Sequence, residues 1–163
     1  MVAVALSVRI QKTVPAPIPP AWLRAVLREA AREPEVAAAL ERLTRRPPEL
    51  TVRIAGARAI RRLHLRFFGD PDETDVLSFP SGTAREDGYL GDVAISWPAV
   101  VRQAARYGHD PGTEASLLAV HGLLHLLGWD HQSAQEEEEM TSRTLAALAR
   151  SQVRPASERL PER

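Results

Sequence analysis

Short apolar segments of the chain predict four β-strands. In the first two, apolar residues occupy every second position, which is the pattern of a strand with one buried face. The third reads as a buried segment that Pro80 stops, and a polar loop over residues 81–88 separates it from the fourth. The expected strands are Val2–Ile10, Leu50–Ile54, Thr74–Phe79 and Tyr89–Ser96.

Six further segments predict helices, and several carry signals of where a helix begins or ends. Proline is tolerated at a helix start because the first N–H groups have no partner within the helix, and Asp110 followed by Pro111 fits an N-cap. Ser133 and Glu136 fit a capping box, and Gly69 closes the third helix. The expected helices are residues 20–31, 35–44, 57–68, 98–107, 111–127 and 134–149.

Strands that interleave with helices through mostly short connections predict one domain of the α+β class. We expect a single layer of about four mixed β-strands packed with helices. The helix over residues 111–127 should be central and buried, because apolar residues surround it on every side. The length of 163 residues fits one domain. We place that domain at residues 1–154 and expect residues 155–163 to be a disordered tail.

The composition is that of an ordinary globular protein, with 44% hydrophobic and 26% charged residues. Basic and acidic residues balance at 21 each, but residues 1–69 hold 13 basic and 5 acidic ones, whereas residues 70–163 hold 8 and 16. Such a chain could present a basic face to an anionic partner. No apolar stretch is long enough to span a membrane, and the N-terminus lacks the pattern of a signal peptide. We therefore expect a soluble cytoplasmic protein.

Three histidines are the candidate ligands of a metal ion. The chain has no cysteine, so histidine and carboxylate side chains must hold any metal. His121 and His125 lie four residues apart and share one face of the predicted helix. Gly128 stands where helices often end in a left-handed residue, and that reversal could bring His131 toward the pair.

Three neutral imidazoles, with a fourth position left to water, are the arrangement of a catalytic zinc site. The alternative is a pair of core histidines bonded to backbone carbonyls and a third histidine at the surface, and we favour the metal. A related spacing occurs in zinc peptidases of the metzincin type, where glutamate follows the first histidine as general base. Gly122 stands at that position here and cannot transfer a proton, so peptide hydrolysis by that scheme is not expected.

Three motifs follow one another along the chain: Thr74-Asp-Val-Leu-Ser-Phe-Pro80, Leu90-Gly-Asp-Val93 and H-G-x-L-H-L-x-G-x-D-H from His121 to His131. With these motifs in this order, the sequence resembles the YbeY family of bacterial zinc-dependent endoribonucleases. The resemblance extends from about Leu63 to His131. It implies zinc bound by His121, His125 and His131, cleavage of single-stranded RNA, and a role in small-subunit ribosomal RNA maturation and ribosome quality control, with the ribosome or a ribosomal protein as a partner.

The sequence departs from this family just before the first motif. Members commonly carry asparagine and, four residues later, arginine, where this chain has His64 and Phe68. The resemblance implies that this arginine contributes to activity by contacting RNA phosphate, which phenylalanine cannot do. Phe68 could stack on a base, but we expect Phe67 and Phe68 to pack in the core.

A stripe of arginines is the candidate RNA-binding surface. Arg58, Arg62 and Arg66 recur every four residues on one predicted helix and could follow an RNA backbone. The alternative is a solvated helix face without a partner, and the sequence favours neither.

Asp130 and His121 are the residues that we expect to take part in catalysis. Asp130 adjoins His131, so it could orient a ligand imidazole or accept a proton from water, and the alternative is that it only caps the turn. Asp75 and Asp92 each stand near the start of a predicted strand close to the expected site, where backbone hydrogen bonding is as plausible as chemistry.

Together these patterns favour a metal-dependent hydrolase that acts on RNA. Zinc lowers the pKa of bound water toward ~7 and polarises a phosphoryl oxygen, and the nucleophile could be water or the 2′-hydroxyl of the RNA. Two alternatives remain open: a non-catalytic RNA-binding or ribosome-assembly factor in which zinc only stabilises the fold, and a zinc peptidase.

Overall fold

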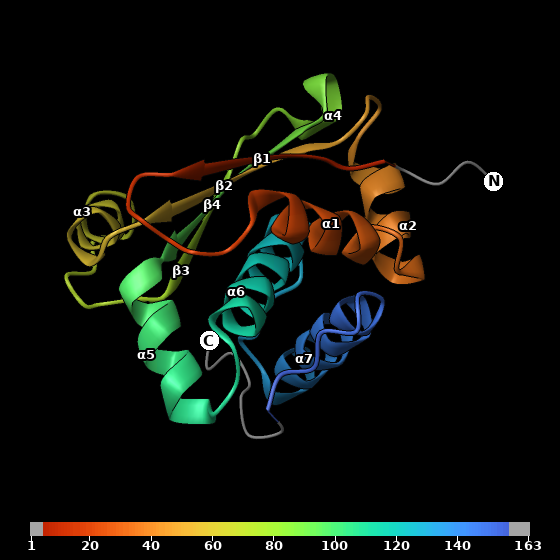
Figure 1. Ribbon diagram of the computed structural model, residues 1–163. Helices are drawn as coiled ribbons and strands as arrows, with labels where there is room; N and C mark the ends of the chain where they lie inside the picture. Colours follow the sequence, from red (N-terminus) through yellow and green to blue (C-terminus); the bar gives the residue numbers. More distant parts are fainter. Residues whose placement is uncertain (1–4, 157–163) are drawn as a thin grey trace.

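The computed structural model describes residues 5–156, in which four strands form one mixed sheet with helices packed against it (Figure 1). The strand order is β1-β2-β4-β3. The first three strands in this order run parallel, and β3 pairs antiparallel with β4 at one edge. The strands are β1 (Ser7–Lys12), β2 (Glu49–Ala55), β3 (Val76–Pro80) and β4 (Tyr89–Ser96). The expected α+β class with about four mixed strands is confirmed.

The six predicted helices are present, with ends within one or two residues of the expected ones. Gly69 ends α3 in a left-handed conformation, and the Ser133 side chain accepts a hydrogen bond from the Glu136 N–H at the start of α7. Asp110 occupies the N-cap position of α6, but its side chain makes no capping hydrogen bond. The helices are α1 (Pro20–Ala30), α2 (Pro34–Leu43), α3 (Ala57–Phe68), α4 (Ala84–Asp87), α5 (Trp97–Tyr107), α6 (Pro111–Leu126) and α7 (Ala134–Ala149).

Two local predictions need correction. The segment 81–88 is not wholly a loop, because the Thr83 carbonyl accepts from the N–H groups of Glu86 and Asp87 and so forms the single turn α4. This turn has no buried residue, so hydrophobic periodicity gives no sign of it. Within the described residues the first strand begins at Ser7, so Ala5 and Leu6 precede it, and the part of the prediction that concerns residues 2–4 lies outside the described residues.

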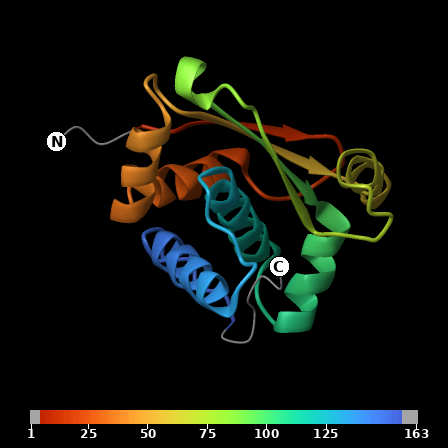
Figure 2. The ribbon, with the colours of Figure 1, turned by 180° about the vertical axis from the view of Figure 1, so that it is seen from behind.

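One face of the sheet carries most of the core. Helices α1, α6 and α7 lie on that side, as the opposite views of Figures 1 and 2 show. The apolar residues that alternate along the strands face these helices and are buried. They include Val8, Leu50, Val52, Ile54, Val93 and Ile95.

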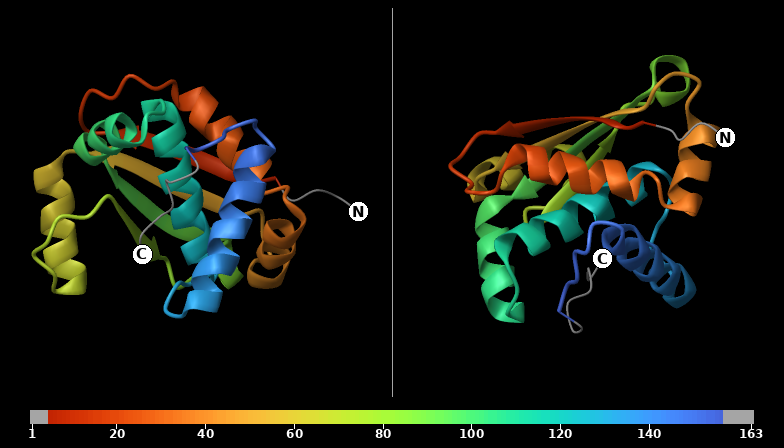
Figure 3. Two further views of the ribbon diagram at one scale, coloured as in Figure 1. Left: turned by 90° about the horizontal axis from the view of Figure 1, so that it is seen from below. Right: turned by 45° about the vertical axis from the view of Figure 1, so that its right-hand side comes forward.

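The other face of the sheet is covered at one end by α3. A smaller apolar cluster forms there between the helix and three strands, and α3 stands apart from the larger helical layer in Figure 3. The cluster consists of Ala55, Ile60, Leu77 and Ala94, with Ala59, Leu63 and Phe79 packed against it. The cavity described below opens at the edge strand β3, between α3 and the helices of the main core.

Helix α6 is the central buried helix that the sequence predicts. Every residue from Glu114 to Leu124 is buried, including the polar Glu114 and His121. Among the helices of residues 5–156, none combines the length and apolar character needed to cross a membrane. At the C-terminal end, Val153 is buried and the Ala156 N–H donates to His109 Nδ1 at 3.0 Å, so the chain is held as far as this residue. The rest of the predicted tail, residues 157–163, lies outside the described residues.

Candidate metal centre and its cavity

The three predicted ligands converge. One candidate nitrogen from each of His121, His125 and His131 lies within 4.8 Å of the other two. The ring centroid of His125 lies 4.8 Å from that of His121 and 4.9 Å from that of His131. In a tetrahedral site with Zn–N bonds of about 2.0–2.1 Å, ligand atoms lie about 3.4 Å apart, so small side-chain rotations close this cluster around a cation. The donor set therefore fits a metal ion.

The turn after α6 is what brings the third histidine back. Gly128 has φ = 106°, a left-handed conformation that side chains other than glycine's rarely adopt. The Trp129 N–H bonds back to the Leu124 carbonyl at 3.0 Å, and Asp130 Oδ1 accepts from the His131 N–H at 2.8 Å. The chain reverses at the point that the glycine predicts, and His131 then faces the two histidines of α6.

Gly122 allows α6 to lie close against the sheet. A Cβ at this position would come within 2.5 Å of Val93 Cγ1, closer than two carbon atoms can approach without movement. The Ser78 hydroxyl donates to the Gly122 carbonyl at 3.1 Å, which ties the same turn of α6 to β3. The chain has no glutamate at this position, and the close approach of Val93 would leave no space for one. The site therefore differs from that of a metzincin in packing as well as in chemistry.

The histidines line a cavity of about 540 Å³, a size typical of small-ligand sites. Its walls come from the end of α3, from β3 and the segment before it, from α5 and from α6. The lining residues are His64, Phe68, Thr74, Asp75, Val76, Leu77, Ser78, Pro80, Gln103, Arg106, Tyr107, Leu118, His121, His125 and His131. No sequence pattern marks Gln103, Arg106 and Tyr107 as site residues, because only the tertiary packing of α5 brings them to the cavity.

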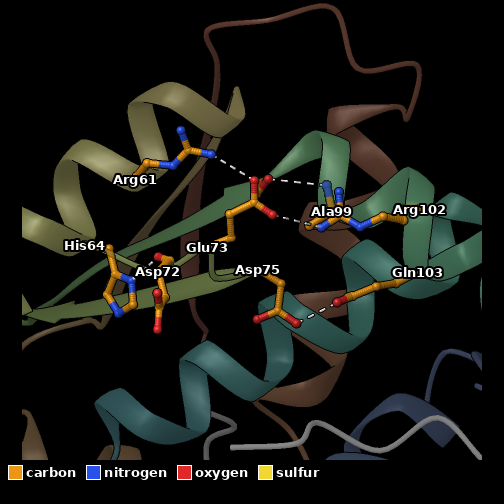
Figure 4. A network of polar contacts seen from close by, with 9 residues as sticks. Arg61, His64, Asp72, Glu73, Asp75, Ala99, Arg102 and Gln103 are labelled. Atoms are coloured by element: carbon orange, nitrogen blue, oxygen red, sulfur yellow. Dashed lines mark hydrogen bonds and ion pairs between the residues drawn. The ribbon is translucent and has the colours of Figure 1, made fainter. Parts of the chain in front are cut away.

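A polar network runs from the cavity wall into the protein. The Gln103 side-chain amide donates to Asp75 Oδ2 at 3.2 Å, as Figure 4 shows, and to the fully buried Glu114 Oε2 at 2.8 Å. His109 Nε2 lies 2.8 Å from Glu114 Oε1. Because His109 Nδ1 accepts from the Ala156 N–H, its proton is on Nε2, which donates to Glu114. The network supports the position of Asp75 and anchors the end of the described chain.

Comparison with known proteins identifies the family. The family model described as "Endoribonuclease YbeY" matches residues 11–152. The chain belongs to the YbeY family. Proteins named Endoribonuclease YbeY from Gloeobacter violaceus and Thermobifida fusca are 45% and 43% identical to it, over 61% and 58% of this chain. The matched segments cover 55% and 66% of those relatives, so the chain spans between half and two thirds of their length.

A solved structure shares the fold of this YbeY-family chain. The solution structure of a Thermotoga maritima protein matches 96% of this chain and 99% of its own, with a TM-score of 0.56 and 19% sequence identity. A further YbeY relative, from Roseiflexus castenholzii, is 42% identical over 63% of this chain and 69% of its own length.

The C-terminal end of α3 carries two exposed aromatic residues, which corrects one prediction. Phe67 and Phe68 are 57% and 53% exposed, so neither packs in the core. They lie at the C-terminal end of α3, where the apolar cluster beneath the helix is too small to cover them. Phe68 lines the metal-site cavity together with His64, whereas Phe67 does not line it.

The two aspartates that the sequence placed near the site lie in different surroundings. Asp75 lines the cavity, whereas Asp92 points from β4 to the opposite face of the sheet, where Arg53 Nε lies 2.6 Å from its Oδ2. The Tyr89 hydroxyl donates to Asp92 and is also hydrogen-bonded to Thr51. Burial and the hydrogen bond to Asp92 raise the pKa of Tyr89 above its usual 10.0. Period-two alternation could have shown this difference, because Val93 beside Asp92 faces the core.

The remaining predicted residues lie outside the cavity. Asp130 lines a separate hollow with Trp129 and receives the His131 N–H, which matches the capping alternative geometrically. Arg58, Arg62 and Arg66 form an exposed stripe on α3. Two members of the stripe, Arg62 and Arg66, line a second hollow between α3 and the sheet.

Proposed function

We propose that the protein is a zinc-dependent endoribonuclease that cuts single-stranded RNA and acts in the maturation of small-subunit ribosomal RNA and in ribosome quality control. Its substrate is ribosomal RNA, its partner the ribosome or a ribosomal protein, and its compartment the cytoplasm. The observation that carries the proposal is the convergence of His121, His125 and His131 on one cavity in a chain of the YbeY family. The relatives that support the activity are named endoribonucleases.

The donor set favours a catalytic rather than a structural metal. Structural zinc sites usually have four protein ligands, whereas catalytic sites have three and leave a position for water or substrate. Within the described residues the cluster offers three imidazoles, and the sequence has no cysteine to add a fourth ligand of the usual kind. The adjoining cavity of about 540 Å³ gives a substrate access to that position.

Two structural elements support the three histidines. His121 and His125 are held by the buried helix α6, and His131 is held by the turn in which Asp130 accepts its N–H. A zinc ion bound there supplies Lewis acidity toward a phosphoryl oxygen and toward water. Asp130 acts as a positioning residue, because its carboxylate fixes the main chain of a ligand from outside the cavity.

Cationic side chains bring the RNA to the site. Arg106 lines the cavity and attracts a phosphate into it. Arg58, Arg62 and Arg66 extend the positive surface along α3, outside the cavity, where they contact the backbone of a longer strand. This placement makes the stripe a contributor to affinity rather than to the bond-breaking step.

The test is cleavage of a labelled single-stranded RNA by the purified protein, with and without a chelator. We expect cleavage that a chelator abolishes and added Zn²⁺ restores, and little cleavage of the same sequence in a duplex. A mobility shift without cleavage would instead indicate the non-catalytic RNA-binding factor. Cleavage that persists unchanged after complete metal removal would exclude the proposed mechanism.

A further inference from the structure

Phe68 is a large aromatic residue whose ring is exposed beside the proposed catalytic site. It is the last residue of α3, the residue is 53% exposed, and it lines the same cavity as His121, His125 and His131. Isolated exposed apolar residues are normal on a protein surface. This one differs because it lines the concave site that holds the candidate metal ligands.

The ring is braced by neighbouring side chains rather than left free to move. The Phe68 ring centroid lies 5.9 Å from that of His64 and 5.7 Å from that of Phe79, at tilted angles. His64 is itself fixed, because its Nδ1 donates to the Asp72 carbonyl at 2.8 Å. Figure 4 shows His64 beside the loop that carries Asp72. The contacts to His64 and Phe79 orient the Phe68 ring while half of its surface stays accessible.

We propose that Phe68 is the stacking platform of a nucleobase subsite within the cavity, so that one base of a single-stranded RNA packs on its ring. This inference rests on the proposed function and adds to it a determinant of substrate choice. Bases have flat aromatic faces that stack on such side chains regardless of sequence, and loss of one stacking contact weakens binding about 5- to 100-fold.

The rest of the cavity has the chemistry that a nucleotide requires. Arg106 on α5 supplies positive charge for a phosphate, and its guanidinium carbon lies 5.2 Å from the centre of the Tyr107 ring. Gln103 and Thr74 add polar groups to the wall between α3 and α5. A base within a duplex is already stacked on its neighbours, so a platform of this kind favours single strands.

Phe67 provides a matched control for Phe68. It is the preceding residue on α3, it is 57% exposed, and its ring centroid lies 5.4 Å from that of Phe79. Phe67 differs from Phe68 in not lining the cavity, and the Arg66 guanidinium lies 5.3 Å from the centre of its ring. A general effect of removing exposed apolar surface from this helix should therefore be the same for both residues.

The experiment measures the Kd of a short fluorescent single-stranded oligoribonucleotide by anisotropy under chelation, and kcat and KM for its cleavage by the metal-loaded protein. The variants are Phe68→Ala, Phe68→Leu, Phe68→Trp and Phe67→Ala, each checked by thermal melting. Phe68→Leu keeps apolar bulk without a ring. We expect Phe68→Ala and Phe68→Leu to raise Kd about 5- to 100-fold, Phe68→Trp to retain binding, and Phe67→Ala to change Kd by less than about 2-fold.

An abasic residue moved along the oligonucleotide sharpens the test. At one position it should weaken binding to the original protein but not to Phe68→Ala, because the stacking partner is already gone. Equal effects of the two alanine variants, or full binding by Phe68→Leu, would overturn the subsite. RNA cleavage with an unchanged Kd in Phe68→Ala would reject the subsite alone, whereas a protein that neither binds nor cuts RNA would reject the proposed function as well.

Discussion

The two faces of the central sheet differ in how they are covered and in what they contribute. The face toward α6 is mostly apolar along its parallel strands and is closed by a helix whose residues from Glu114 to Leu124 are all buried. The other face is covered by α3 at one end and carries the hydrogen-bonded group Thr51, Tyr89 and Asp92 beyond it. The candidate metal ligands come from α6 on the first face and from the turn that follows it, and the exposed Phe68 comes from the helix on the second face.

Under the proposed function, this difference separates the demands of chemistry from those of substrate recognition. Metal ligands must be held in a fixed geometry, and a close-packed helix provides that rigidity. A surface that contacts a long polymer must remain accessible, so its aromatic and cationic residues stay outside the core. The cavity lies where the two regions meet, at the edge strand β3.

The largest effect is expected from His125→Ala, which removes a candidate metal ligand carried by α6. We expect the variant to lose stoichiometric zinc and its ribonuclease activity to fall by roughly 1000-fold or more, because one missing ligand disrupts a three-histidine site. Metal analysis of the purified protein and single-turnover cleavage check both points. Gln132→Ala, an exposed change beside His131, is the control. Retention of one zinc per chain by His125→Ala would show that the ligand assignment is wrong.

Gly122→Ala tests whether close packing of α6 on the sheet supports the site. The new Cβ would lie 2.5 Å from Val93 Cγ1, so the helix or the strand must move. Overpacking of this kind costs about 1–3 kcal/mol, which outweighs the gain of up to ~1 kcal/mol in helix propensity. We expect Tm to fall by about 2–10 °C in thermal unfolding and zinc affinity to weaken with it.

Gly112→Ala on the same helix is the matched control for this substitution. There the nearest atoms belong to the Trp22 ring at 3.2 Å, and Trp22 is 37% exposed and can yield. We expect little change or a slight gain in stability. If both alanine variants have the stability of the original protein, the tight approach of α6 to β4 is not important for the fold.

The sequence predicted the face toward α6 well, because buried positions recur at regular intervals along a strand or helix. Alternation identified β1, β2 and their buried sides, and the glycines at 69 and 128 identified the ends of helices by the left-handed conformation that glycine permits. The convergence of the three histidines could be predicted from the spacing of two of them on a helix and from the turn that precedes the third. Each of these signals is local, within about ten residues.

The features outside this face were predicted less well. Some depend on tertiary packing, and others place apolar residues at the surface. Phe67 and Phe68 were expected in the core, since aromatic residues usually are, yet both are exposed. Gln103 and Arg106 reach the cavity through the packing of α5 beside α6, for which no local pattern exists. The single turn α4 has too few residues to show a helical period.

Tyr89→Phe tests the polar face of the sheet and should have the smallest effect. The variant loses the hydrogen bonds of the hydroxyl to Thr51 and Asp92, while Arg53 stays paired with Asp92 at 2.6 Å. We expect a loss of about 0.5–1.5 kcal/mol in the free energy of unfolding at neutral pH. Urea denaturation measures this loss, and metal content and cleavage should remain unchanged because the residue lies across the sheet from the histidines.

The pH dependence of this variant provides an internal check. Burial and the hydrogen bond to Asp92 raise the pKa of Tyr89 above the value of 10.0 that applies to the unfolded chain. The folded state therefore holds this proton more tightly, so its contribution to stability is complete below about pH 10 and declines as the pH rises toward the folded pKa. Tyr89→Phe lacks the titrating group, so its stability should decline less than that of the original protein between about pH 9 and about pH 11. Parallel curves for the two proteins over this range would mean that the Tyr89 hydroxyl is no better protected from ionisation in the fold than in the unfolded chain.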